Sequence, residues 1–455
     1  MHTFLQTEKL LMSSANLQNY NHYRSNLNLA LPVVLSQAGQ IVVVFADNLM
    51  VGQLGATQLA AAAFANSIFL VGMVFGIGLA MGITPLVGTA YGSGDRIGAI
   101  RWLKKGFKIY PLLAVAQALI MACIALLIPY MGQSSEVVRL AIPYYLILVL
   151  SIIPFQYFFV YKQYSEGLGN TRIAMTITVT ANLLNIFLNY LLIYGKMGFP
   201  AMGLNGAGIA TFISRLIMPL MFFVFFKKLN FFHPERAFKE KIKLTKDSAK
   251  KLLNIGLPIG AQSIVEVLTF SLGSIMMGWI GEKALAAHQI VLSLASFAFM
   301  SASGLAAATT IKVSHFKGMN NKVAIVKSVN ASLVMVTIFM ICSVTAFMLL
   351  RFTIPGWFVP DPEVIKIAGG LMLIAGLFQI FDGLQIITLG ALRGLADVKA
   401  PMIFLMIAYF PIALPISYAM TFVFNLGPQG IWIGYLSGLV MVATLLLFRF
   451  RWKMK

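Results

Sequence analysis

Residues 31–95 read LPVVLSQAGQIVVVFADNLMVGQLGATQLAAAAFANSIFLVGMVFGIGLAMGITPLVGTAYGSGD, and residues 257–321 read LPIGAQSIVEVLTFSLGSIMMGWIGEKALAAHQIVLSLASFAFMSASGLAAATTIKVSHFKGMNN. Laid over each other without a gap, at an offset of 226 positions, the two stretches match at recurring positions. The matches include Leu31-Pro32 with Leu257-Pro258, Gly52 with Gly278, Gly55 with Gly281, Gly78-Leu79-Ala80 with Gly304-Leu305-Ala306 and Gly92 with Gly318. Further along, the offset is 227 for Gly167-Leu168 with Gly394-Leu395, and 224 for Gly203 and Gly206 with Gly427 and Gly430. This nearly constant offset predicts a chain built from two related halves.

The composition predicts that both halves lie in a membrane. Of the 455 residues, 59% are hydrophobic and only 11% are charged, whereas soluble proteins are about one quarter charged. Apolar runs of about 20 residues recur along the chain, and each can cross a hydrocarbon layer of ~30 Å as a helix. We expect twelve such helices, over residues 29–54, 59–83, 107–130, 140–163, 172–194, 205–227, 253–280, 284–311, 328–350, 367–391, 399–422 and 428–449.

Successive connections between the spans are alternately rich and poor in lysine and arginine. The segments 92–108, 228–251 and 312–327 and the C-terminus are rich in them, and the intervening connections are poor. Basic loops face the cytoplasm, so both termini and the central connection are predicted to be cytoplasmic. The fold class is therefore an all-α integral membrane protein of twelve transmembrane helices in two six-helix lobes. Since six is even, the lobes are related by a pseudo-twofold axis along the membrane normal.

This arrangement divides the chain into five parts. They are a cytoplasmic N-terminal segment 1–28, an N-lobe 29–227, a cytoplasmic inter-lobe linker 228–252, a C-lobe 253–449 and a cytoplasmic tail 450–455.

The charge pattern and the missing motifs exclude several functions. The formal charge of +20 is spread over short segments between apolar spans, so it predicts no nucleic-acid partner. The sequence contains no Walker A motif, zinc signature or nucleophile elbow. We therefore expect neither an enzyme nor an ATP-driven pump, and no cofactor other than a transported ion.

Three acidic residues lie at membrane depth: Asp47, Glu266 and Asp382. A carboxylate there costs about 2.5–3.5 kcal/mol on an insertion scale, and such residues usually mark ion or substrate pathways. They can alternate between a proton-bound and an ionised state, and ionised they offer hard oxygen ligands to a small cation. The alternative is that each acid is structural and hydrogen-bonded to a neighbouring helix.

The repeat relates the positions of these acids. Glu266 aligns with Gln40, whereas Asp47 aligns with Gly273, seven positions further along. Seven residues are nearly two helical turns, so the two acids share a helix face at depths about 10 Å apart. The lobes thus share a scaffold but differ in their charges.

Polar residues on two other spans are candidate partners. Asn182, Asn185 and Asn189 are spaced along one helical stripe, and they either bond between helices or surround Asp47. His288 and Gln289 are adjacent in the eighth span, where a satisfied pair at a helix interface is the simpler interpretation.

Several motifs together resemble the multidrug and toxic compound extrusion (MATE) family, in its NorM-like bacterial branch. They are VVVFADNLMVGQLG around Asp47, GLPIGAQSIVEV around Glu266, AAHQ at 286–289, NLLNIFLNYLLIYGKMG at 182–198, and FQIFDGLQ with ALRGLADVKAPM within 378–402.

This resemblance implies a secondary antiporter that exports cationic amphipathic drugs from a bacterial cytoplasm in exchange for Na⁺ or H⁺. It implies cation coupling, with Na⁺ as a candidate ligand, at Glu266 and Asp382, and a coupling role for Asp47. It also implies solute or polar-partner roles for Asn185, Asn189, Thr211 and Gln289. Some relatives are acidic where this chain has Asn189.

The expected location is the bacterial inner membrane, in contact with lipid, as a monomer. One alternative is a lipid-precursor flippase of the same architecture, which would favour a basic cavity for pyrophosphate head groups. The other is a structural or enzymatic membrane protein that uses the acids with a divalent metal.

Overall fold

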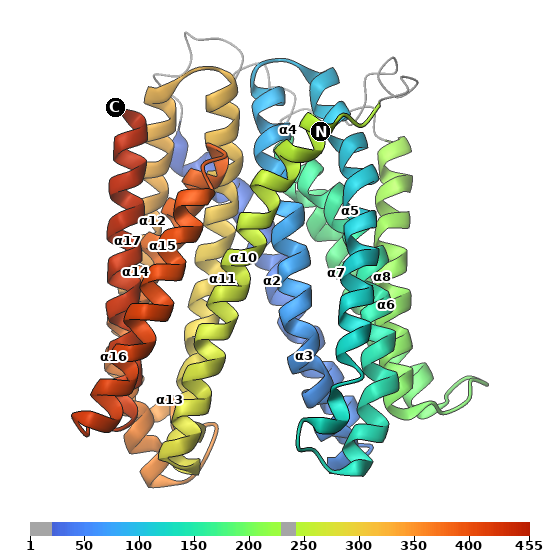
Figure 1. The fold of residues 1–455 in the computed structure, drawn as a ribbon, viewed down its shortest axis with the longest axis vertical. Coiled ribbons are helices and arrows are strands. Elements are labelled where there is room, and N and C mark those ends of the chain that lie inside the picture. The colour runs from blue at the N-terminus through green and yellow to red at the C-terminus, as the bar shows by residue number, and fades with distance from the viewer. Residues whose placement is uncertain (1–20, 229–242) are drawn as a thin grey trace.

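The computed structural model describes residues 21–228 and 243–455. Residues 1–20 of the expected N-terminal segment and residues 229–242 of the expected linker lie outside this description. Within the described residues, twelve helices are long and apolar enough to cross a membrane, as the sequence predicted. Figure 1 shows them as two lobes side by side, with the start of α2 and the end of α17 on one side of the molecule, called here the terminal side.

The first lobe contains α2 (His22–Gly52), α3 (Ala56–Met81), α4 (Ile83–Gly92), α5 (Arg96–Ile124), the 3₁₀ turn η2 (Ile128–Tyr130), α6 (Ser135–Gly167), α7 (Thr171–Tyr194) and α8 (Gly203–Lys228). The second contains α10 (Lys246–Ile280), α11 (Glu282–Gly318), α12 (Lys322–Leu350), α13 (Thr353–Gly356), α14 (Pro362–Gly394), α15 (Lys399–Ala408), the π-helical turn η3 (Tyr409–Ala413), α16 (Leu414–Tyr418), the π-helical turn η4 (Ala419–Val423) and α17 (Pro428–Met454). Together α3 and α4 form the second span, and the elements from α15 to η4 form the eleventh.

Equivalent turns in the two lobes have the same backbone conformation. Gly55 and Gly281, which are 226 positions apart, have φ angles of 124° and 145° and precede the second helix of each lobe. Gly203 and Gly427, which are 224 positions apart, have φ angles of 54° and 59°. Glycine adopts positive φ without the steric cost of a Cβ atom, which explains why these turn residues recur in the repeat.

Most helices extend beyond the predicted spans on the terminal side. α10 begins at Lys246, inside the predicted linker, and α17 continues to Met454, through the predicted tail. α11 has 37 residues and is therefore ~55 Å long, well beyond the ~30 Å hydrocarbon layer. Lys312, expected in a loop, consequently lies within α11 and is buried.

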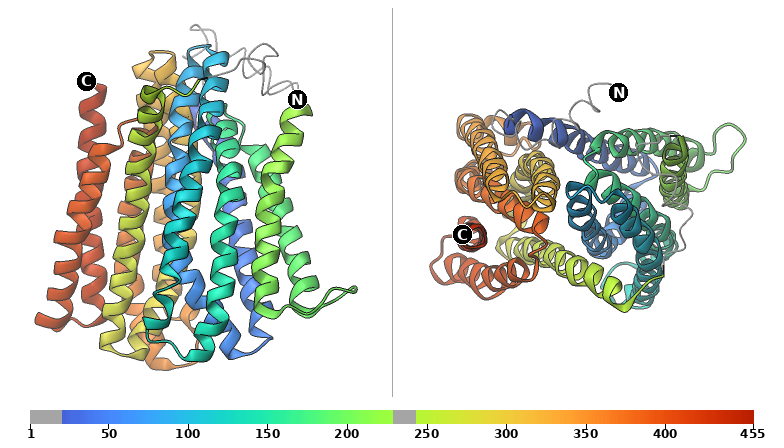
Figure 2. Two further views of the ribbon diagram at one scale, coloured as in Figure 1. Left: turned by 45° about the vertical axis from the view of Figure 1, so that its right-hand side comes forward. Right: turned by 90° about the horizontal axis from the view of Figure 1, so that it is seen from above.

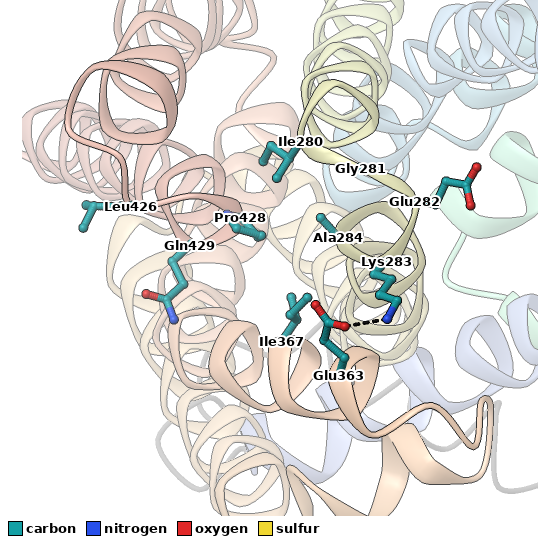
Figure 3. Close-up of a pocket in the computed structure, with 10 residues that line it drawn as sticks. All are labelled: Ile280, Gly281, Glu282, Lys283, Ala284, Glu363, Ile367, Leu426, Pro428 and Gln429. Carbon is teal, nitrogen blue, oxygen red and sulfur yellow. Dashed lines mark hydrogen bonds and ion pairs between the residues drawn. The ribbon is translucent and has the colours of Figure 1, made fainter.

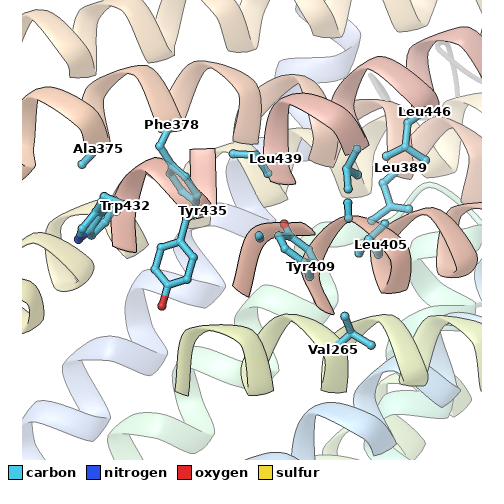
Figure 4. Packing of buried hydrophobic residues seen from close by; sticks show 14 of the residues in the cluster. Val265, Ala375, Phe378, Leu389, Leu405, Tyr409, Trp432, Tyr435, Leu439 and Leu446 are labelled. Atoms are coloured by element: carbon cyan, nitrogen blue, oxygen red, sulfur yellow. The ribbon is translucent and has the colours of Figure 1, made fainter. Parts of the chain in front are cut away.

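Small residues and large rings fill the interior of the lobes. In the second lobe, Phe378, Trp432 and Tyr435 pack beside Leu405, Tyr409 and Leu439 (Figure 4). Tight packing rather than the hydrophobic effect holds helices together in lipid, where the solvent is as apolar as the side chains.

The two lobes contact each other towards the terminal side. Asn26 of α2 donates a hydrogen bond to Ser332 of α12 at 2.8 Å, and Gln37 of α2 donates one to Ser303 of α11 at 2.7 Å. His315 Nε2 lies 2.7 Å from the carbonyl oxygen of Gly167 in the first lobe. Asn26 and His315 lie near the terminal-side ends of α2 and α11, whereas Gln37 and Ser303 lie near the middle of these helices. The lobes diverge towards the opposite, far side (Figure 1), and the view from above shows them next to each other (Figure 2).

Candidate functional site

Asp47 lies in a polar cluster inside the first lobe, formed by α2, α7 and α8. Asn189 donates a side-chain hydrogen bond to Asp47 Oδ1. With the Asn185 amide turned so that its NH₂ faces the carboxylate, Asn185 also donates to Asp47 Oδ1, at 3.1 Å, and its oxygen accepts from the Thr211 backbone N–H at 3.3 Å. The structure therefore brings together four residues that the sequence had nominated from three separate spans.

One acceptor of this first-lobe cluster has no partner among the described residues. Asn189 Oδ1 is buried and receives no hydrogen bond. An unsatisfied buried acceptor costs free energy, and a water, a proton-bearing group or a cation would satisfy it. Asn182, in contrast, lies against Gly39 of α2, where a Cβ would be 3.2 Å from its amide nitrogen, so it belongs to the α2–α7 packing.

Arg215 adds a positive charge to the first lobe. It lies halfway along α8, and its Nη1 donates to Ser151 Oγ at 2.7 Å. Its guanidinium carbon is 5.1 Å from the ring centroid of Phe69 and 4.5 Å from that of Phe155. These cation–π contacts hold the charge inside the lobe, between α3 and α6.

Glu266 lies in a second polar cluster, inside the other lobe. Gln385 of α14 donates to Glu266 Oε1 at 3.3 Å, and the Tyr409 hydroxyl donates to Gln385 Oε1 at 3.2 Å. Tyr409 begins the π-helical turn η3, which contains Pro411. Because proline lacks an N–H and displaces the preceding turn, the helical ladder is interrupted here, and such turns often occur at functional sites.

Asp382 is 7% exposed on α14 and lies close enough to Glu266 to interact electrostatically. Its carboxylate has no hydrogen-bond donor among residues 21–228 and 243–455. A buried carboxylate without a donor requires a proton or a cation. Those same residues contain no group of three or more His, Cys, Asp or Glu side chains placed to hold a metal ion. Na⁺ would therefore need amide or hydroxyl oxygens besides the two carboxylates.

Arg393 and Gln262 were not nominated from the sequence, yet they complete the second cluster. Arg393 Nη2 donates to Gln262 Oε1 at 3.0 Å, and Arg393 interacts electrostatically with Glu266. Their spacing in the sequence puts each of them on the same helix face as an acid. Gln262 is one helical turn before Glu266, and Arg393 is eleven residues, or three turns, after Asp382. The predicted span ends at 391, two residues before Arg393.

The two clusters differ in their charge balance. With all groups ionised, Asp47 and Arg215 sum to zero, whereas Glu266, Asp382 and Arg393 sum to minus one. Uncompensated charge is costly in low dielectric. The second cluster can therefore take one additional positive charge, whereas the first cluster is neutral without one.

Gln289 does not join either cluster. Its neighbour His288 is satisfied at a helix interface, as expected, because Trp432 Nε1 donates to His288 Nδ1 at 3.2 Å and Ser274 Oγ lies 3.1 Å from His288 Nε2. Gln289 is exposed on α11, and the Ser293 hydroxyl donates to its backbone carbonyl oxygen. In the described part of the chain its side chain has no hydrogen-bond partner, so the structure gives no contact that supports a polar-partner role.

A hollow of about 640 Å³ lies at the far side of the second lobe, away from the acids (Figure 3). The α10–α11 turn, the start of α14 and the start of α17 line it, and Lys283 Nζ bonds Glu363 Oε2 at 2.5 Å across its rim. Neither Glu266 nor Asp382 lines this hollow. The exposed ion pair adds little stability but ties the turn to α14.

Comparison with known families reproduces the internal repeat. The MatE family model matches this chain twice, over residues 32–191 and 258–419. The two matches start 226 positions apart, the same offset that relates residues 31–95 to 257–321.

Curated relatives align along almost the whole chain. The probable multidrug resistance protein NorM of Rhizobium meliloti (strain 1021) is 34% identical over 449 residues, which cover 98% of this chain and 96% of the relative. The multidrug resistance protein MdtK of Yersinia pseudotuberculosis serotype O:1b (strain IP 31758) is 32% identical over 450 residues, covering 95% and 96%.

Solved structures show the same architecture. A crystal structure of MATE in the straight conformation superposes with a TM-score of 0.85 at 20% identity, covering 97% of this chain and 98% of that one. The eukaryotic MATE transporter AtDTX14 superposes with a TM-score of 0.82 at 19% identity, covering 94% and 95%. At these identities the solved structures establish the fold alone.

Proposed function

Because this chain belongs to the MatE family, we propose that it is a secondary active multidrug efflux antiporter that exports cationic amphipathic compounds in exchange for Na⁺ or H⁺. The relatives named multidrug resistance proteins support the solute class. The chain is then a transporter rather than an enzyme. Both polar clusters lie within one chain, so the proposed working unit is a monomer surrounded by lipid.

The charge balance of the second lobe carries the proposal. Glu266 and Asp382 interact electrostatically and have one partly buried arginine, Arg393, beside them, which leaves one negative charge of this cluster to be neutralised. A proton or Na⁺ entering from outside supplies that charge. An inward gradient then does work, since each charge that crosses 100 mV releases ~2.3 kcal/mol.

The shape of the molecule supports alternating access. The lysine and arginine pattern assigns the terminal side to the cytoplasm of a bacterial inner membrane. The lobes meet on that side and diverge on the far side, so this conformation would release solute and admit the coupling ion outside the cell.

A hydrogen-bonded connection from Glu266 to the interrupted eleventh span supports the coupling. Gln385 bonds both Glu266 and Tyr409, and Tyr409 begins the interrupted part of the eleventh span. Protonation or cation binding at Glu266 changes what Gln385 can donate to, and so favours a different packing of that span. A ligand shifts a conformational equilibrium only through such a difference in its contacts.

Dye efflux from proteoliposomes tests the proposal. Ethidium export is measured under an imposed Na⁺ or H⁺ gradient for the wild type and for E266Q, D382N and D47N, with E136Q as the control at an exposed acid of the first lobe. We expect E266Q and D382N to lose gradient-driven export and E136Q to keep it. Intact export in all three variants of the membrane acids, or none by the wild type under either gradient, would refute the proposal.

The flippase alternative is less well supported by the charges. A site for pyrophosphate head groups needs several basic residues, whereas each polar cluster has one arginine next to at least one carboxylate.

A further inference from the structure

Two helices from different lobes, α5 and α10, bring basic residues together on the terminal side (Figure 1). Apolar contacts hold the two helices side by side, because Ile100 and Leu103 of α5 and Leu252 of α10 belong to one buried cluster. Next to these contacts, Lys105 of α5 interacts electrostatically with Lys251 of α10. Since both side chains are positive, the contact between the lobes keeps two like charges near each other.

The lysines at this contact have no carboxylate partner in the described part of the chain. Lys105, Lys250 and Lys251 form no ion pair there. Asp247, about one helical turn before the two lysines of α10, is not bonded to either of them within those same residues. Lys105 Nζ lies 4.7 Å from the ring centroid of Trp102, a cation–π contact that leaves its charge in place. The positive charges of the two helices therefore favour the binding of an anion between them.

Lys105 and Lys251 lie at the level of the lipid head groups. Each precedes a predicted apolar span by two residues, since these spans begin at residues 107 and 253. Trp102, whose ring contacts Lys105, is partly buried, and tryptophan is enriched at the boundary between membrane and water. The phosphate of a phospholipid lies at the same depth as these two lysines.

Both helices continue from their lysines into an exposed apolar face. On α5, Lys108 is followed by Leu112 and Leu119, which are 71% and 63% exposed. On α10, Leu257 and Leu268 are exposed and lie eleven residues apart, which is three helical turns and hence one face. A basic end followed by an apolar face matches the order of head group and acyl chains in a phospholipid.

We propose that an anionic phospholipid of the phosphatidylglycerol class binds between α5 and α10, with its phosphate on Lys105 and Lys251 and its acyl chains along the exposed apolar faces. Basic sites between transmembrane helices are known to bind such head groups. The site contains residues of both lobes and is complete only while the lobes are in contact there. The bound lipid therefore stabilises the conformation in which the lobes meet on the terminal side.

Native mass spectrometry measures this binding directly. Delipidated protein is titrated with palmitoyl-oleoyl phosphatidylglycerol, or with the zwitterionic phosphatidylcholine of the same chains, and the affinity for the first bound lipid is compared. The test variant is K105Q/K251Q. The matched control is K322Q/K399Q, which removes the same charge from exposed lysines at the starts of α12 and α15. K105R/K251R keeps both charges.

We expect the wild type to bind phosphatidylglycerol at least about tenfold more tightly than phosphatidylcholine. Loss of each lysine should weaken phosphatidylglycerol binding about fivefold, so K105Q/K251Q should weaken it ~25-fold. K322Q/K399Q should stay within about twofold of the wild type. K105R/K251R should bind as the wild type does, because arginine also pairs with phosphate.

Pulsed EPR measures the effect of the lipid on conformation. Spin labels at Met197 and Trp357, exposed positions of different lobes, are placed in a cysteine-free background, and the protein is reconstituted in phosphatidylcholine nanodiscs with or without phosphatidylglycerol. The anionic lipid should increase the population that has the inter-lobe distance of this structure. The increase should occur in the wild type and in K322Q/K399Q but not in K105Q/K251Q.

Four outcomes would overturn the inference. The first is equal affinity of the wild type for the two lipids, and the second is an equal loss of phosphatidylglycerol binding in K105Q/K251Q and K322Q/K399Q, which would indicate a general attraction to the basic side. The third is displacement of the lipid by an equal concentration of glycerol 3-phosphate, which would identify a soluble phosphate as the ligand. The fourth is lipid binding at the two lysines with no change in the distance distribution. None of these measurements involves transport, so they stand or fall independently of the proposed efflux function.

Discussion

Replacing Gly78 by alanine should force the two lobes apart on the terminal side. Gly78 of α3 lies against the α10 backbone, and a Cβ there would be 2.6 Å from Gly260 Cα, 2.8 Å from Gly260 N and 3.0 Å from the carbonyl carbon of Ile259. Carbon atoms pack at about 3.5–4.0 Å, so the helices would have to separate by ~1 Å. Backbone atoms cannot rotate aside as a side chain would.

The added Cβ destabilises only the conformation in which α3 and α10 are in contact. Overpacking of this kind costs about 1–3 kcal/mol, which corresponds to a ~5- to 150-fold shift of the equilibrium away from the state in which the lobes meet on the terminal side. The matched control is Gly278→Ala: this glycine is also two to three residues from a helix end, and a Cβ there would meet nothing within 4 Å.

Spin labels on the two lobes would measure the shift. After serine replacement of the exposed Cys123 and Cys342, labels are placed at Met197 and Trp357, which are 77% and 74% exposed in different lobes. Pulsed-EPR distances should show a new population in G78A and the wild-type distribution in G278A. An unchanged distribution in G78A would refute the close helix contact on which the argument rests.

Two further variants test the polar clusters. Asn189→Asp would place a second carboxylate in contact with Asp47, so transport should become dependent on an external cation. Dye efflux measured against Na⁺ concentration and pH checks this. Efflux that depends on Na⁺ and pH as in the wild type would contradict it. Gln262→Leu would leave the buried guanidinium of Arg393 without its acceptor and should destabilise the protein by about 1–3 kcal/mol, seen as a lower Tm in detergent. Gln262→Glu, which restores an acceptor, should recover most of that loss, and a Tm that does not change in the leucine variant would show that the bond is unimportant.

The sequence located the acids and their nearest first-lobe partners well because helical spacing is regular. Asn185 and Asn189 lie four residues apart and therefore point the same way, and both do face Asp47. Their neighbour Asn182, on the same stripe, packs against Gly39 instead. Spacing predicts which side chains share a face but not which helix that face meets.

The predictions failed where helices continue beyond the apolar run. Lys312 was expected in the connection 312–327, and Arg393 lies two residues beyond a predicted span, yet the two residues lie within α11 and α14. The protein interior, rather than lipid, surrounds these positions, so a charged side chain there can be satisfied by partners such as Gln262. The hydropathy of one segment contains no information about a hydrogen-bond partner on another helix.

The sequence by itself determined that this protein spans the membrane twelve times in two homologous lobes, because the length of an apolar run and the offset of a repeat are properties of the linear chain. Only the tertiary structure decided that the lobes meet on the terminal side, and that the polar cluster around Asp47 is balanced in charge while the cluster around Glu266 and Asp382 has an excess negative charge. Those properties depend on which helices face each other across a low-dielectric interior, where a single arginine from a distant span changes the electrostatics of a carboxylate.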